Sequence, residues 1–105
     1  MSTLPEASNF FACLNTTAAK KDIADWFGTQ GWLVRKVGFD DFELRCSWAE
    51  LALEGEIPRL LHGLVADIVS NSVVILSVLD AHHVVYYGEC EDEDHQMINA
   101  FSSLN

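Results

Sequence analysis

The residues best suited to metal chemistry lie in the last quarter of the chain. Imidazole and thiolate groups bind zinc and other transition metals, and carboxylates can complete such a site. Adjacent histidines on an extended chain point to opposite faces, and the sequence has neither Cys-x-x-Cys nor His-x-x-x-His spacing. We therefore prefer a solvated acidic turn here, with no cofactor. A metal-binding protein or metal-dependent enzyme is the alternative, and its candidate ligands are His82, His83, Cys90 and His95.

None of the cysteines has the surroundings of a catalytic nucleophile. A reactive thiolate needs nearby positive charge or a helix N-terminus, whereas Cys90 is flanked by Glu89 and Glu91, whose charge raises a thiol pKa. Cys46 falls on the apolar face of an alternating segment, and Cys13 lies inside an apolar run. A Gly-x-Ser-x-Gly elbow is absent as well. We therefore expect a protein that is not an enzyme.

The charge balance narrows the range of partners. The chain has 16 acidic and 6 basic residues, for a net charge of −10. Beyond Arg59 there is no lysine or arginine, so residues 60–105 carry seven acids and a charge of −7. Nucleic acids and anionic membranes both require lysine and arginine, so neither is an expected partner. Basic proteins and a second copy of the chain remain.

These observations favour a non-enzymatic interaction protein of the small acidic bacterial type. An inhibitor, immunity or antitoxin-like protein of this kind meets a basic partner through its carboxylates, which steer the encounter and select against wrong partners. Tyrosine is a frequent anchor in interfaces. A homodimer that uses its sheet face or edge is a further alternative. The predicted partner-binding residues are Asp40, Asp41, Tyr87, Glu89, Glu91, Asp92 and Asp94.

The length and the cysteine count indicate one domain in a reducing compartment. A chain of 105 residues suits a single globular domain over residues 1–105, with 1–8 frayed. Three cysteines are an odd number for a disulfide framework, and this favours the cytoplasm. No apolar run approaches a membrane span, and the first residues lack the charged and hydrophobic regions of a signal peptide.

In the first half of the chain, the apolar pattern predicts strands around one helix. The run 9–14 is typical of a buried strand, and apolar residues at helical spacing predict a helix over 16–28 that ends at Gly28. A second strand is expected over 32–37. The alternation over 42–54 slips at Ala49, which indicates either a β-bulge in one strand or two strands that meet there.

The second half is ambiguous between helix and strand. Residues 60–68 have the apolar spacing of a helix face, although Gly63 weakens it, and 73–81 fits either a helix or a strand. A strand is expected over 84–90 and a short helix over 97–104. One helix within 60–82 gives the order strand, helix, strand, strand, helix, strand. We therefore predict a small α+β two-layer sandwich with ferredoxin-like order (β-α-β-β-α-β), in which two helices cover one face of an antiparallel sheet.

Overall fold

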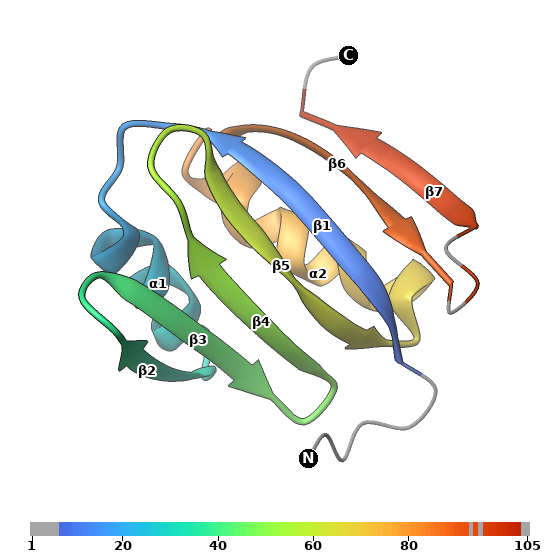
Figure 1. Cartoon of the computed structure of the whole chain (residues 1–105), viewed down its shortest axis with the longest axis horizontal. Coiled ribbons are helices and arrows are strands. Elements are labelled where there is room, and N and C mark those ends of the chain that lie inside the picture. The colour runs from blue at the N-terminus through green and yellow to red at the C-terminus, as the bar shows by residue number, and fades with distance from the viewer. Residues whose placement is uncertain (1–6, 93, 95, 104–105) are drawn as a thin grey trace.

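The computed structural model describes residues 7–92, 94 and 96–103, which form one antiparallel sheet and two helices (Figure 1). Seven strands lie in the order β2-β3-β4-β5-β1-β6-β7. The elements are β1 (Ala7–Asn15), α1 (Lys20–Thr29), β2 (Leu33–Val37), β3 (Asp41–Cys46), β4 (Ala49–Glu54), β5 (Arg59–Ala66), α2 (Ile68–Ala81), β6 (Val85–Glu91) and β7 (Met97–Ser102). Within the described part of the chain, no helix has the length and apolar character needed to cross a membrane.

The α+β character is present, but the ferredoxin-like two-helix sandwich predicted from the sequence is wrong, because the sheet has more strands. Residues 41–54 form the hairpin β3–β4 rather than one bulged strand, with its turn at Ser47 and Trp48. Residues 59–66 form β5 rather than the start of a helix, and 97–102 form β7 rather than a closing helix.

The apolar spacing of β5 misled the prediction because β5 is a central strand with apolar side chains on both faces. Leu61 and Val65 are four residues apart, a spacing that puts two side chains on one face of a strand as well as of a helix. Both are buried under the helices, while Leu60 and Leu64 lie on the other face, opposite Cys13 and Asn9 of β1.

Both helices lie behind the sheet in the view of Figure 1 and leave its front face uncovered. Helix α1 packs on β2, β3 and β4, and α2 packs on β1 and β5. The core lies between the two layers and contains alternate residues of the strands together with the inward sides of the helices. Its largest fully buried side chains are Phe10, Phe27, Leu14, Ile23, Leu44, Leu53, Leu61, Ile75, Leu79, Val65 and Cys90.

The helix ends differ from those predicted. Helix α1 continues through Gly28 to Thr29, and the residue with positive φ is Gly31, at 95°. Helix α2 begins five residues before the predicted position 73, with Asp67 as its N-cap in the left-handed conformation (φ 46°). The helical interpretation of 73–81 is therefore correct, and the strand interpretation is wrong.

Candidate interaction face

The side of the sheet that faces away from the helices is the candidate functional surface, and we call it the open face. It consists of the outward side chains of alternate strand residues. In the middle of it Phe11 of β1 lies between His62 of β5 and Glu89 of β6 in the strand register. Glu50 and Glu54 of β4 lie opposite Leu64 and Leu60 of β5. Residues from both halves of the chain therefore meet on this face.

Two depressions hollow the open face and join at His62 and Gly63, which line both of them. One has a volume of about 410 Å³ and the other about 480 Å³. We call the combined hollow the trough. Gly63 lets β5 approach β4 closely at this point, because a Cβ atom there would lie 2.0 Å from the carbonyl oxygen of Glu50. Besides the two shared residues, the trough is lined by Glu43, Arg45, Glu50, Leu51, Ala52, Asn9, Phe10, Phe11, Glu89 and Glu91.

Carboxylates outnumber cations on the open face. Among the described residues, five glutamates lie on it: Glu43, Glu50, Glu54, Glu89 and Glu91. The two guanidinium groups of this face are already paired, Arg35 with Glu43 at 3.1 Å and Arg45 with Glu50 at 3.7 Å. Such exposed pairs contribute little to stability, but they use up the positive charge of the face and leave it three charges negative with His62 neutral.

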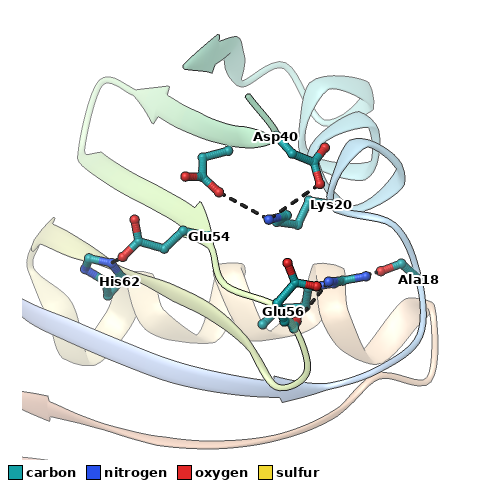
Figure 2. Close-up of polar contacts among 8 residues, drawn as sticks. Ala18, Lys20, Asp40, Glu54, Glu56 and His62 are labelled. Atoms are coloured by element: carbon teal, nitrogen blue, oxygen red, sulfur yellow. Dashed lines mark hydrogen bonds and ion pairs between the residues drawn. The ribbon is translucent and has the colours of Figure 1, made fainter. Parts of the chain in front are cut away.

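His62 is held by one of these glutamates. Its Nε2 atom lies 2.8 Å from Glu54 Oε1 (Figure 2), and both side chains are partly exposed. The ring centroid of His62 is 6.3 Å from that of Phe11. The imidazole therefore links the carboxylates of β4 to the aromatic centre on β1.

Two aromatic side chains protrude from this acidic face. Phe11 is 42% exposed and Tyr87 is 58% exposed, on neighbouring strands. Tyr87 lies opposite Cys13. A hydrogen bond between their side chains raises the pKa of Tyr87, and the negative charge of the Cys13 thiolate raises it further. Exposed large aromatic groups in a depression are typical of binding surfaces rather than of solvated ones.

The predicted partner-binding residues fall into three separate groups. Tyr87, Glu89 and Glu91 lie together on the open face of β6. Asp92 belongs to the following turn, where its Oδ1 accepts hydrogen bonds from the backbone N–H groups of Asp94 and Gln96, each at 2.9 Å. The turn thus uses Asp92 for its own structure.

Asp40 and Asp41 lie at the far end of the sheet, around a lysine of α1. Their carboxylates are 3.6 Å and 3.2 Å from Lys20 Nζ (Figure 2). Lys20 is only 5% exposed, which is rare for a lysine unless its charge is paired. These two aspartates therefore neutralise a charge of the protein itself.

The predicted metal ligands do not come together among the described residues. His82 and His83 follow the end of α2, and the His82 ring stacks on Trp26 at a centroid distance of 3.9 Å. Cys90 is fully buried in the core, and burial raises the pKa of its thiol. His95 lies outside the described residues. In the part of the chain that the structure covers, no three histidine, cysteine or acidic side chains are placed to hold a metal ion.

The sequence did not single out Phe11, Glu43, Glu50, Glu54 or His62 as site residues. A signal for Glu50 and Glu54 was present, since they alternate with buried Ala49, Leu51 and Leu53 along one strand. Strand pairing was the missing information, because the pairing of β4 with β5 and of β5 with β1 brings these glutamates onto the same face as Phe11.

Comparisons with protein-family models, curated proteins and solved structures returned no match. The chemistry of the open face is therefore the basis for assigning a function. What this face offers a ligand is negative charge on both sides of an apolar aromatic centre, in a shallow trough that runs across five strands.

Proposed function

We propose that the chain is a protein-binding module without enzymatic activity, and that its open face binds a partner rich in lysine and arginine. The observation that carries the proposal is the arrangement of five glutamates around exposed Phe11 and Tyr87. An inhibitor, immunity or antitoxin-like role belongs to this class of function. The three cysteines are free, and Cys13 and Cys90 are buried, which fits a protein of the reducing cytoplasm.

The aromatic side chains and the carboxylates of the open face each have a physical use in binding a cation. Lysine and arginine bury their aliphatic stems on apolar surface and keep the charged head in contact with acceptors. Phe11 and Tyr87 offer the apolar surface and the aromatic ring faces that attract cations, and Glu50, Glu54 and Glu89 offer the carboxylates. The excess negative charge also speeds encounter with a cationic surface.

The same reasoning gives the leading role to the glutamates of β4 and β6. Asp40 and Asp41 are paired with Lys20, and Asp92 accepts two backbone hydrogen bonds. A partner would have to compete with the contacts to buried Lys20 and to the backbone. Glu50 and Glu89 border the trough itself, and the only ion pair described for either of them is the long one, at 3.7 Å, between Glu50 and the exposed Arg45.

The test compares a quadruple variant of the open face with a matched control. E50Q/E54Q/E89Q/E91Q changes the net charge from −10 to −6 without changing side-chain shape. D22N/D25N/E56Q/D67N makes the same change in charge on α1, the β4–β5 turn and the N-cap of α2. Immobilised wild-type protein captures partners from an extract of the cells that produce it, and the affinity of each purified partner is then titrated at low and high salt.

We expect the captured partner to be basic and to bind the open-face variant at least about tenfold more weakly, with a flatter salt dependence. The control variant should stay within about twofold of wild type, because general steering is weaker than close contact. Equal binding by the open-face variant, or a partner without a basic surface, would contradict the proposal.

A further inference from the structure

The outer side of α2 carries three exposed valines, with the exposed serines Ser70 and Ser77 among them. The twelve residues from Ile68 to Leu79 include no charged side chain. Ile75 and Leu79 face the core and are fully buried, yet Val69, Val73 and Val74 on the outer side are 60%, 64% and 45% exposed. Large apolar side chains that gather on one exposed side of a helix are typical of an interaction surface, so the outer side of α2 is a candidate for one.

A hollow lies beside this exposed row of valines. It has a volume of about 260 Å³ and is bordered by Val74, Ser77 and Val78 of α2 on one side and by Trp32, Cys46 and Trp48 on the other. The two tryptophan rings meet edge to face with centroids 5.2 Å apart. Gln30 and Gly31 complete its lining. The same surface therefore carries both a protruding row of valines and a hollow with two tryptophan rings, and a twofold interface between identical chains is self-complementary in this way.

Charge indicates which partner fits this surface. The molecule carries −10 in total, so two copies repel each other wherever their acidic surfaces meet. The outer side of α2 is uncharged from Ile68 to Leu79, and two copies that meet there bring no carboxylates together along that length. A cationic partner, by contrast, finds no carboxylate to pair with on that length of the helix.

We propose that a second copy of this chain covers α2, and that Val69, Val73 and Val74 of each copy pack toward the tryptophan-lined hollow of the other around a twofold axis. Two α2 helices of 14 residues, about 21 Å long, cross each other in this arrangement. A stable interface buries about 800 Å² per partner, and the hollow beside the helix widens the contact beyond a single helix face. The dimer leaves both open faces accessible, because α2 lies on the opposite side of the sheet (Figure 1).

The test is the mass of the protein in solution, measured by light scattering during size-exclusion chromatography over a range of concentrations. The wild-type chain should have a mass near 23.4 kDa, twice its 11.7 kDa. V69E/V73E should be monomeric, or should raise the dissociation constant of the dimer at least about tenfold, because each interface then gains four like charges. Glutamate is also a better helix former than valine, so the variant should still fold.

F39E/I57E is the matched control, because it adds the same two charges per chain at turn residues that are 94% and 55% exposed. This control should remain a dimer, and circular dichroism should show the wild-type fold in all three proteins. A monomeric wild-type chain would overturn the proposal, and it would indicate that a different protein or a membrane surface covers the exposed side of α2. A dimer that V69E/V73E leaves intact would overturn it too, because the interface would then lie elsewhere, for example along β7.

Discussion

Two lysines stand next to each other at the start of α1, and the fold gives them different surroundings. Lys20 is 5% exposed, and its ammonium group lies between the carboxylates of Asp40 and Asp41. Lys21 pairs with Asp25 one helical turn later, in full contact with water. Helical spacing does not distinguish the two positions, because it cannot anticipate that the β2–β3 turn closes over one of them.

Substituting each lysine by alanine should separate these roles. We expect Lys20→Ala to lower the free energy of unfolding by about 1–3 kcal/mol, because its buried stem and its hydrogen bond to a carboxylate are both lost. Lys21→Ala should change it by no more than about 0.5 kcal/mol, as for other exposed helix pairs. Urea unfolding at neutral pH measures both, and equal values would contradict the distinction.

Tyr86 is a buried residue whose proton matters to stability. Its hydroxyl donates to Asp80 Oδ1 at 2.7 Å. Burial, with the hydrogen bond and the charge of Asp80, raises the pKa of Tyr86 to about 12, from 10.0 for an unperturbed tyrosine. The folded state therefore holds this proton at a pH where the unfolded chain releases it, so stability falls as the pH rises above 10 toward 12.

Tyr86→Phe should reveal this linkage. At pH 9 the variant should be about 1–2 kcal/mol less stable than wild type, because the hydrogen bond is lost. The difference should shrink as the pH rises through 11, since only the wild-type protein loses the contribution of Tyr86 there. Urea unfolding at several pH values gives the difference, and a constant gap across this range would contradict the assignment.

Among site residues, those on β6 could be predicted and those on β4 and β5 could not. Tyr87, Glu89 and Glu91 alternate along a strand that the sequence identifies, so their common face follows from its period of two. His62 was placed on a helix, and its contact with Glu54 depends on a strand pairing that no local pattern specifies.

At the scale of elements, Gly88 lies where β6 approaches β1 closely. A Cβ atom there would lie 2.0 Å from the carbonyl oxygen of Phe11 and 2.8 Å from Cζ of Phe101. Neither the backbone of β1 nor the Phe101 ring, which stacks on Phe10 at 5.3 Å, has room to move freely. The pairing of β6 with β1 therefore requires glycine at this position.

We expect Gly88→Ala to cost more than about 3 kcal/mol or to prevent folding, as for severe clashes in a core. Gly28→Ala is the control, since Gly28 lies in α1 and a Cβ there would be in ordinary contact with Val34 at 3.4 Å. That change should be neutral or stabilise by about 0.5–1 kcal/mol through helix propensity. Thermal unfolding of both variants decides the comparison, and a well-folded Gly88→Ala protein would contradict it.

Elements with one apolar face were predicted better than elements with two. The inward side of α1 follows a helical period, and the helix was found with its end misplaced by one residue. The break at Ala49 left two alternatives, and the second, two strands that meet there, is the one that the structure has. The strands β5 and β7 were missed because their apolar residues do not alternate. The period of such a segment does not distinguish a helix from a strand, and only its length and its neighbours in the sequence can.

At the scale of the whole molecule, the charge of −10 opposes folding, because it is more concentrated in the native state than in the extended chain. Salt screens this repulsion. We therefore expect the melting temperature to rise by a few degrees between low and moderate sodium chloride, corresponding to about 1 kcal/mol. E50Q/E54Q/E89Q/E91Q should show a smaller rise, which differential scanning fluorimetry can measure, and an equal rise would argue against repulsion on the open face.

The position of β1 inside the sheet sets the order in which the molecule can assemble. The first strand of the chain pairs with β5 and β6, whose residues lie about 50 and 80 positions later. A growing chain can build α1 and the meander β2–β5 from neighbouring segments, but the other edge of β1 stays open until residues 85–91 have been synthesised. Folding rates fall as contacts become less local, so we expect stopped-flow refolding to be slower than for helical domains of this length. Until then the apolar run Phe10–Leu14 is the part of a nascent chain most in need of protection from aggregation.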